Sequence, residues 1–188
     1  MKRLVLLVIL TTLFNSHVQS QDEVTKWAKI VKKGKEELVT YKLEFYFHDI
    51  FTGKNPSAAR IAEASVTNSS KNLFGAVFMV DDRLTVGPDL NSKLVGRARG
   101  MYGSAGQSEA DIIMMMSCMF LDGIYNGSSF SVMSINHVLN PVREMSIVGG
   151  TGLFRLGRGY AILRTYSFDS TTGDTVVGYN VTISAPAE

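Results

Sequence analysis

The sequence predicts an all-β fold, because apolar and polar residues alternate along most of the chain and turn-forming residues separate the alternating runs. In the clearest run, Leu43, Phe45 and Phe47 fall on one face, while Glu44 and Tyr46 fall on the other. No long stretch shows a helical period. Strands at this spacing indicate a β-sandwich or a β-barrel, and a closed antiparallel barrel leaves no exposed edge and can hold one small ligand.

The alternating segments are typical of about eight strands with short connections. In chain order they are residues 41–50, 59–66, 73–80, 93–102, 111–121, 129–138, a run around Ile147, 157–168 and 175–184. Turn chemistry separates them at 53–56, 87–89, 122–123 and 172–174, where glycine occurs with proline, asparagine or aspartate.

The first twenty residues have the features of a secretory signal peptide. A basic start is followed by an apolar core and a small-residue exit before Gln21. The apolar run is shorter than the roughly 20 residues that cross a bilayer, so we expect a secreted protein and no membrane partner. The charged residues 21–40 are interpreted as an N-terminal arm, and residues 41–188 as a single barrel domain.

Composition excludes some partners and cofactors. Once the leader with Lys2 and Arg3 is removed, the 19 basic residues become 17, equal to the 17 acidic residues. The mature chain then has no net charge, which does not favour a nucleic-acid partner. Beyond the leader only His48, His137 and one cysteine remain, with no spacing typical of a metal site, and no flavin or nicotinamide fingerprint occurs. We therefore expect neither metal nor cofactor.

The single cysteine excludes an intrachain disulfide. Cys118 lies in an apolar run and is expected to be buried, with a reactive thiol as the alternative. In a secreted chain, the sequons at Asn68, Asn126 and Asn180 predict N-glycosylation. Asn180 lies in an alternating run, so a glycan there requires an outward-facing side chain.

The glycine-rich segment 142–161 poses the question of a phosphate-binding loop. A dinucleotide fingerprint fails at Arg155, and a Walker loop fails at Arg158. The residues that follow alternate as a strand instead of beginning a helix. We therefore expect these glycines to permit positive φ, a bulge and sharp bending of a barrel.

Several blocks together resemble the plant dirigent protein family. They are FYFHDI (45–50), FGAVFMVDDRLTVGP (74–88), VGRARGMY (95–102), DGIYNGSSFSV (122–132) and VREMSIVGGTGLFRLGRGYA (142–161). The resemblance implies a secreted glycoprotein of the apoplast. It also implies an eight-stranded antiparallel up-and-down β-barrel of the calycin or allene-oxide-cyclase-like type, assembled as a homo-oligomer, dimer or trimer.

The resemblance also implies two activities. One branch steers the coupling of two phenoxy radicals, such as those of coniferyl alcohol, that an external laccase or peroxidase supplies. A second branch eliminates water from a flavonoid precursor and closes a ring through a quinone methide. We take the non-oxidising guide as the leading hypothesis, the dehydratase or cyclase as its alternative, and a binding or wall-organising protein as a third.

Three residues match polar pocket positions of the family: Asp49, Tyr102 and Arg143. Asp49 is a candidate acid or base, and the alternative is an aspartate that only forms a turn. Tyr102 is a candidate hydroxyl donor, and the alternative is an ordinary tyrosine at the rim. Arg143 is a candidate charged donor, and the alternative is a structural ion pair. Asp82 is favoured over Asp81 as a fourth catalytic candidate, because it shares a face with Phe78.

Three further residues are expected to bind substrate: Phe47, Met133 and Asn136. Asn136 occupies the position where pinoresinol-forming members carry an aspartate, and an asparagine can orient a phenol but cannot transfer a proton. Those members also often carry a cysteine pair that this chain lacks. Both departures move the sequence toward the more diverse branch that contains the ring-closing members.

Overall fold

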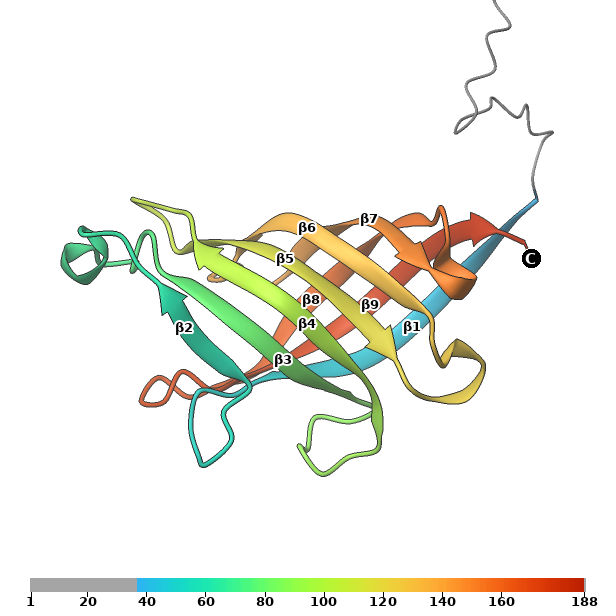
Figure 1. The fold of residues 1–188 in the computed structure, drawn as a ribbon, viewed down its shortest axis with the longest axis horizontal. Coiled ribbons are helices and arrows are strands. Elements are labelled where there is room, and N and C mark those ends of the chain that lie inside the picture. Colours follow the sequence, from blue (N-terminus) through green and yellow to red (C-terminus); the bar gives the residue numbers. More distant parts are fainter. Residues whose placement is uncertain (1–36, 188) are drawn as a thin grey trace, which may run out of the picture. The chain divides into compact units, whose positions relative to one another are not determined.

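A computed structural model describes residues 37–187 of the protein, which form nine strands and three single 3-10 turns (Figure 1). The strands are β1 (Leu38–Asp49), β2 (Ala58–Ala62), β3 (Val77–Thr85), β4 (Leu94–Ser104), β5 (Asp111–Phe120), β6 (Ser129–His137), β7 (Arg143–Thr151), β8 (Arg158–Phe168) and β9 (Thr175–Pro186). The 3-10 turns are η1 (Thr67–Ser69), η2 (Gly123–Tyr125) and η3 (Gly152–Phe154). Within residues 37–187, no helix has the length and hydrophobicity to span a bilayer. The predicted signal peptide and residues 21–36 of the predicted arm lie outside the described residues.

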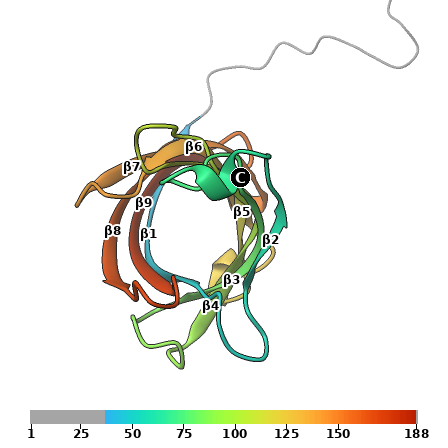
Figure 2. The ribbon, with the colours of Figure 1, turned by 90° about the vertical axis from the view of Figure 1, so that its left-hand side faces the viewer.

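The sheet closes into a barrel, because β1 pairs with β9 along its whole length and with β3 at its end. From β3 to β9 each strand pairs antiparallel with the next in the chain, and the closed ring is visible end-on in Figure 2. The predicted eight-stranded antiparallel barrel is confirmed, and its eight strands are β1 and β3 to β9. The short β2 pairs with the first half of β3, at a level that β1 does not cover.

β1 begins at Leu38, so the last residues of the predicted N-terminal arm belong to the barrel, and two other strands differ more from the predicted segments. β2 ends at Ala62, although alternation continues to Val66, because its register with β3 shifts between Arg60 and Ala62 and the chain then enters η1. β3 begins at Val77 and not at 73, because the backbone at Leu73 and Gly75 has positive φ, 54° and 88°. It continues to Thr85 through a charged stretch that the hydrophobic pattern does not mark.

One half of the barrel is packed solid with aromatic rings. The ring of Phe130 lies 5.9 Å from that of Phe120 and 6.3 Å from that of Phe154, centroid to centroid. Tyr41 contacts Phe154 edge-on at 5.3 Å. Phe130 and Phe154 have no exposed surface. Burial of these rings supplies much of the hydrophobic stabilisation and closes this end of the barrel.

The glycine-rich segment forms β7, η3 and the start of β8. Gly152 has φ of 58°, and a Cβ on it would lie 2.5 Å from the Ser128 hydroxyl oxygen, so glycine is required at this turn. The β6–β7 register shifts between Ser131 and Val132, which leaves Val148 as a bulged residue. The predicted positive φ and bulge are therefore confirmed.

The seam between β1 and β3 is held by a buried histidine. Thr85 donates its hydroxyl proton to the Gly87 carbonyl oxygen at 2.7 Å, so His48 Nε2, also 2.7 Å from the Thr85 oxygen, acts as the donor in that contact. The neutral ring is favoured, because burial, together with Arg83, lowers the pKa of His48. In this register Phe47 faces Leu84 and His48 faces Arg83, so one further step brings Asp49 opposite Asp82.

Candidate active site

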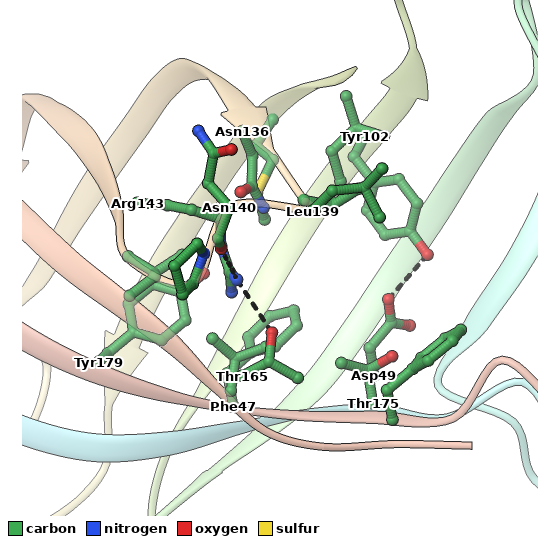
Figure 3. Close-up of a pocket in the computed structure, with 17 residues that line it drawn as sticks. Phe47, Asp49, Tyr102, Asn136, Leu139, Asn140, Arg143, Thr165, Thr175 and Tyr179 are labelled. Carbon is green, nitrogen blue, oxygen red and sulfur yellow. Dashed lines mark hydrogen bonds between the residues drawn. The ribbon is translucent and has the colours of Figure 1, made fainter. Parts of the chain in front are cut away.

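The half of the barrel away from the aromatic cluster encloses a cavity of about 530 Å³ (Figure 3). This volume falls within the range of roughly 300–1,000 Å³ that is typical of small-molecule sites. Its lining is mostly apolar, with a few polar groups from different strands. The lining residues are Phe47, Asp49, Tyr102, Ile112, Met114, Asn136, Val138, Leu139, Asn140, Pro141, Arg143, Leu163, Thr165, Phe168, Thr175, Val177 and Tyr179.

Asp49 and Tyr102 form a hydrogen-bonded pair at one wall of the cavity. The last residue of β1 points inward and accepts a 2.8 Å hydrogen bond from the Tyr102 hydroxyl at Oδ2, while its Oδ1 has no partner among the described residues. Burial raises the pKa of Asp49 to about 6, although the Tyr102 hydrogen bond opposes that shift. Asp49 therefore lies on the cavity wall with one carboxyl oxygen that has no hydrogen-bond partner among the described residues, and it exchanges its proton near neutral pH.

Asp82 lies behind this pair and is completely buried. Ser57 donates a short hydrogen bond to its Oδ1, and its Oδ2 has no partner among the described residues. Burial raises the pKa of Asp82 to about 8, and the nearby Asp49 charge adds to this effect. Two carboxyl groups placed this way do not ionise together readily, so the pair holds one proton at neutral pH.

The shifted pKa of Asp82 predicts how stability depends on pH. In the unfolded chain this carboxyl loses its proton near pH 4, whereas the folded barrel retains it to about pH 8. The free energy of unfolding therefore falls as pH rises between these values. We expect Asp82→Asn, which keeps the Ser57 hydrogen bond, to be more stable than wild type by on the order of 2 kcal/mol at pH 8, with the gain shrinking toward pH 4.

Urea unfolding at pH 5 and pH 8 measures this difference, with Asp81→Asn as the matched control. Asp81 lies on the outer face, where hydrogen bonds from Arg97 and Arg99 outweigh the effect of burial and lower its pKa. Asp81→Asn is expected to lower the free energy of unfolding, and more so at high pH, because it removes the attraction between the ionised carboxylate and the two arginines. An Asp82→Asn gain that does not change with pH would contradict the assigned protonation state.

Arg143 holds the opposite wall of the cavity and fixes the loop above it. Its Nη1 donates to the Thr165 hydroxyl at 2.9 Å and to the Asn140 carbonyl oxygen at 3.1 Å (Figure 3). Its Nε has no partner among the described residues. Burial lowers its pKa, yet a guanidinium remains charged at any physiological pH. Arg143 therefore places a positive charge across the cavity from Asp49.

Asn136 adds a neutral polar group to the wall on which Arg143 lies. It is buried, and its Nδ2 lies 3.2 Å from the Met114 sulfur. Its Oδ1 has no partner among the described residues and can accept a hydrogen bond from a bound hydroxyl. The site thus offers an acidic wall at Asp49 and a hydrogen-bonding wall at Asn136 and Arg143, with apolar surface between them.

The structure brings together most of the residues proposed from sequence. Asp49, Tyr102, Arg143, Asn136 and Phe47 line the cavity, and Asp82 lies directly behind it.

Met133 does not line the cavity. It is 57% exposed, because Phe130 and Val132 fix the inward parity of β6 and odd-numbered positions point outward. Met114 lines the cavity instead, and its even-numbered position in β5, where even-numbered residues are buried, indicates that it points inward. The sequence does not identify Thr165, Tyr179 or the loop 138–141 as site residues, because no local pattern places them beside Arg143.

Other groups named from sequence lie away from this cavity. Cys118 is a free, buried thiol, as expected, and burial raises its pKa to about 12. Within residues 37–187, no three histidine, cysteine or acidic side chains are grouped so that they would hold a metal ion. Asn68, Asn126 and Asn180 are all exposed.

Comparison with known proteins points to one family. A family model described as Dirigent-like protein matches residues 40–184. The chain is 50% identical over 182 residues to Dirigent protein 23 of Arabidopsis thaliana, covering 97% of this chain and 95% of the relative. It is 49% identical over 151 residues to Pterocarpan synthase 1 of Glycine max, covering 80% and 81%. The solved structure of the pterocarpan synthase dirigent protein GePTS1 superposes with a TM-score of 0.78 at 43% identity, covering 85% of this chain and all of that one.

Proposed function

The chain belongs to the dirigent-like protein family, as its sequence blocks predict, and from this membership and the geometry of the cavity we propose that it binds a planar phenolic alcohol and closes a ring in it by loss of water. The observation that carries this proposal is the buried Asp49–Asp82 pair, with raised pKa values, behind an apolar cavity. Orientation of a ligand alone needs no such acids, and burying them costs stability.

The reaction uses the two walls of the cavity in different ways. The substrate lies with its phenol oxygen toward Arg143 and Asn136 and its alcohol carbon toward Asp49. Protonated Asp49 donates a proton from Oδ1 to the departing hydroxyl, the C–O bond breaks, and water leaves. The phenol releases its proton to water at the mouth of the cavity, and Arg143 stabilises the charge that develops on the oxygen, giving a quinone methide.

Ring closure restores the acid. A second hydroxyl of the same molecule adds to the methide carbon and gives its proton to the Asp49 carboxylate, while the phenol oxygen regains a proton from water. The net change is the loss of one water, with no oxidation or reduction. The Tyr102 hydroxyl, bonded to Asp49 Oδ2, holds the carboxyl in the orientation that keeps Oδ1 free.

A second candidate function is the guidance of phenoxy-radical coupling. The apolar lining favours it, because a flat aromatic radical held against such a surface exposes one face only. A difference of about 1.4 kcal/mol between two couplings already gives tenfold selectivity. An external laccase or peroxidase supplies the radicals in this case.

One assay separates the two functions. Purified protein is incubated without oxidant with a hydroxyisoflavan that carries a benzylic alcohol conjugated with a phenol and a second hydroxyl for ring closure. It is also incubated with coniferyl alcohol in the presence and absence of laccase. Chiral chromatography then resolves the products. We expect ring-closed product of high enantiomeric excess without oxidant. Selectivity that appears only with laccase would replace this proposal with the guide, and no effect in either reaction would leave a binding role.

Secretion into the apoplast and self-assembly as a dimer or trimer are part of the same proposal. The outer face of β3 to β6 carries a row of methionines in register, Met79, Met101, Met115 and Met133, and we assign self-association to this face. Met79, Met115 and Met133 are 43%, 36% and 57% exposed, so the row presents apolar surface to solvent. Sedimentation of the purified protein measures the assembly.

A further inference from the structure

A second hollow lies on the outer surface of the barrel, where β1, β9 and β8 run side by side. Its volume is about 430 Å³. Six outward-facing residues define this outer groove: Glu44, Tyr46, Arg164, Tyr166, Gly178 and Asn180. None of them takes part in the reaction proposed above.

The groove exists because a glycine sits between two large side chains. Tyr46, Gly178 and Arg164 stand in one register row across the three strands, so the middle of the row has no side chain. Tyr166 lies within the register shift between Thr165 and Ser167 of β8, where it has no partner on β9, and it is 62% exposed. Its ring meets that of Tyr46 edge-to-face at 5.7 Å. The result is a trough with aromatic walls.

The rim of the groove is polar and partly charged. Glu44 and Asn180 face each other in the next register row, and Asn180 Nδ2 donates to Glu44 Oε1 at 3.0 Å. Arg164 is exposed on the other side. Aromatic faces above a polar rim match a sugar, because its C–H face is apolar and its hydroxyl edge exchanges hydrogen bonds with carboxylate, amide and guanidinium groups.

Asn180 is also the acceptor of the sequon Asn180-Val181-Thr182, so the sugar that matches the outer groove can be attached to the groove's own rim. We propose that Asn180 carries an N-linked glycan whose first sugars lie in the outer groove against Tyr46 and Tyr166. An amide nitrogen that bears a sugar keeps one hydrogen, so the bond to Glu44 persists after glycosylation. Asn68 and Asn126 do not line this groove, and a glycan on either has no such contact with it. The proposal requires passage through the secretory pathway and is independent of the reaction in the cavity.

The first test is occupancy and its effect on stability. The full chain is expressed with its leader in a plant secretory host, and glycopeptide mass spectrometry is expected to find Asn180 occupied. Asn180→Gln is expected to lower Tm by about 2–4 °C, a shift typical of losing a modest contact in a domain of this size. Asn68→Gln and Asn126→Gln serve as matched controls that leave Tm unchanged. An unoccupied Asn180 overturns the proposal.

The second test asks whether the glycan acts through the groove. In a Tyr166→Ala background, which lacks one aromatic wall, the Tm loss caused by Asn180→Gln is expected to disappear. The same variants made without glycan in the bacterial cytoplasm isolate the side-chain bond between Asn180 and Glu44, and there Asn180→Gln is expected to have little effect. A Tm loss of equal size in the Tyr166→Ala background, or in the bacterial protein, overturns the packing of the glycan in the groove.

Discussion

Replacing Asp49 with asparagine is expected to lower kcat for ring closure by about 10²–10⁴-fold, the usual contribution of a positioned acid–base group. Asparagine fits the same space and still accepts the Tyr102 hydrogen bond, but it cannot give or take a proton. Wild-type kcat/KM is expected to fall as pH rises through about 6, because the proton-donating form of Asp49 is lost there. Product formation measured by chiral chromatography over pH 4.5 to 8 checks both effects.

The control for this variant is Asp81→Asn, which removes a carboxyl from the outer face of the same region. Its kcat is expected to match that of wild type. If Asp49→Asn retains more than about a tenth of the wild-type rate, Asp49 is not the proton donor. If it loses ring closure but keeps selectivity in laccase-driven coupling, the cavity orients ligands independently of its acid.

Replacing Phe130 with alanine is expected to lower the free energy of unfolding by about 3–5 kcal/mol, the cost typical of a large cavity in a core. Phe130 is fully buried and contacts Phe45, Phe120 and Phe154. Because β-strands hold these rings at fixed spacing, the neighbours cannot collapse into the space. Domains of this kind have about 5–15 kcal/mol in total, so this one change removes a large share of the stability.

Denaturant titration measures this loss, and Phe168→Ala is the matched control. Phe168 is 64% exposed at the end of β8, so removing its ring is expected to change stability by less than about 0.5 kcal/mol. A loss below about 1 kcal/mol for Phe130→Ala would mean that the aromatic half of the barrel rearranges freely.

The two halves of the barrel have opposite energetic roles. In the aromatic half, burial of the rings stabilises the fold and fixes the strands relative to one another. The hollow half forgoes packing and keeps buried carboxyl groups without full hydrogen bonding at Asp49 and Asp82, which lowers stability. A barrel that is rigid at one end can maintain such a site at the other.

The fold class and the inward-facing positions follow from the alternation of apolar and polar residues in the sequence. A period of two forces alternate residues to opposite faces, so Phe47 and Asp49 share a face wherever the strand lies, and the same rule places Met133 outside. The strand limits around β2 and β3 were less accurate, because a register shift and two positive-φ residues interrupt the chain without disturbing its hydrophobic pattern.

Which inward-facing residues meet depends on how the strands are arranged in three dimensions. Asp49 and Asp82 come together because β1 crosses to β3 to close the ring, and Arg143 reaches Thr165 because β7 and β8 are paired in a particular register. Strand alternation carries no information on which strands become neighbours or how far each is displaced along the other. The raised pKa values follow from that placement, since desolvation and the approach of a second charge exist only once the barrel is closed.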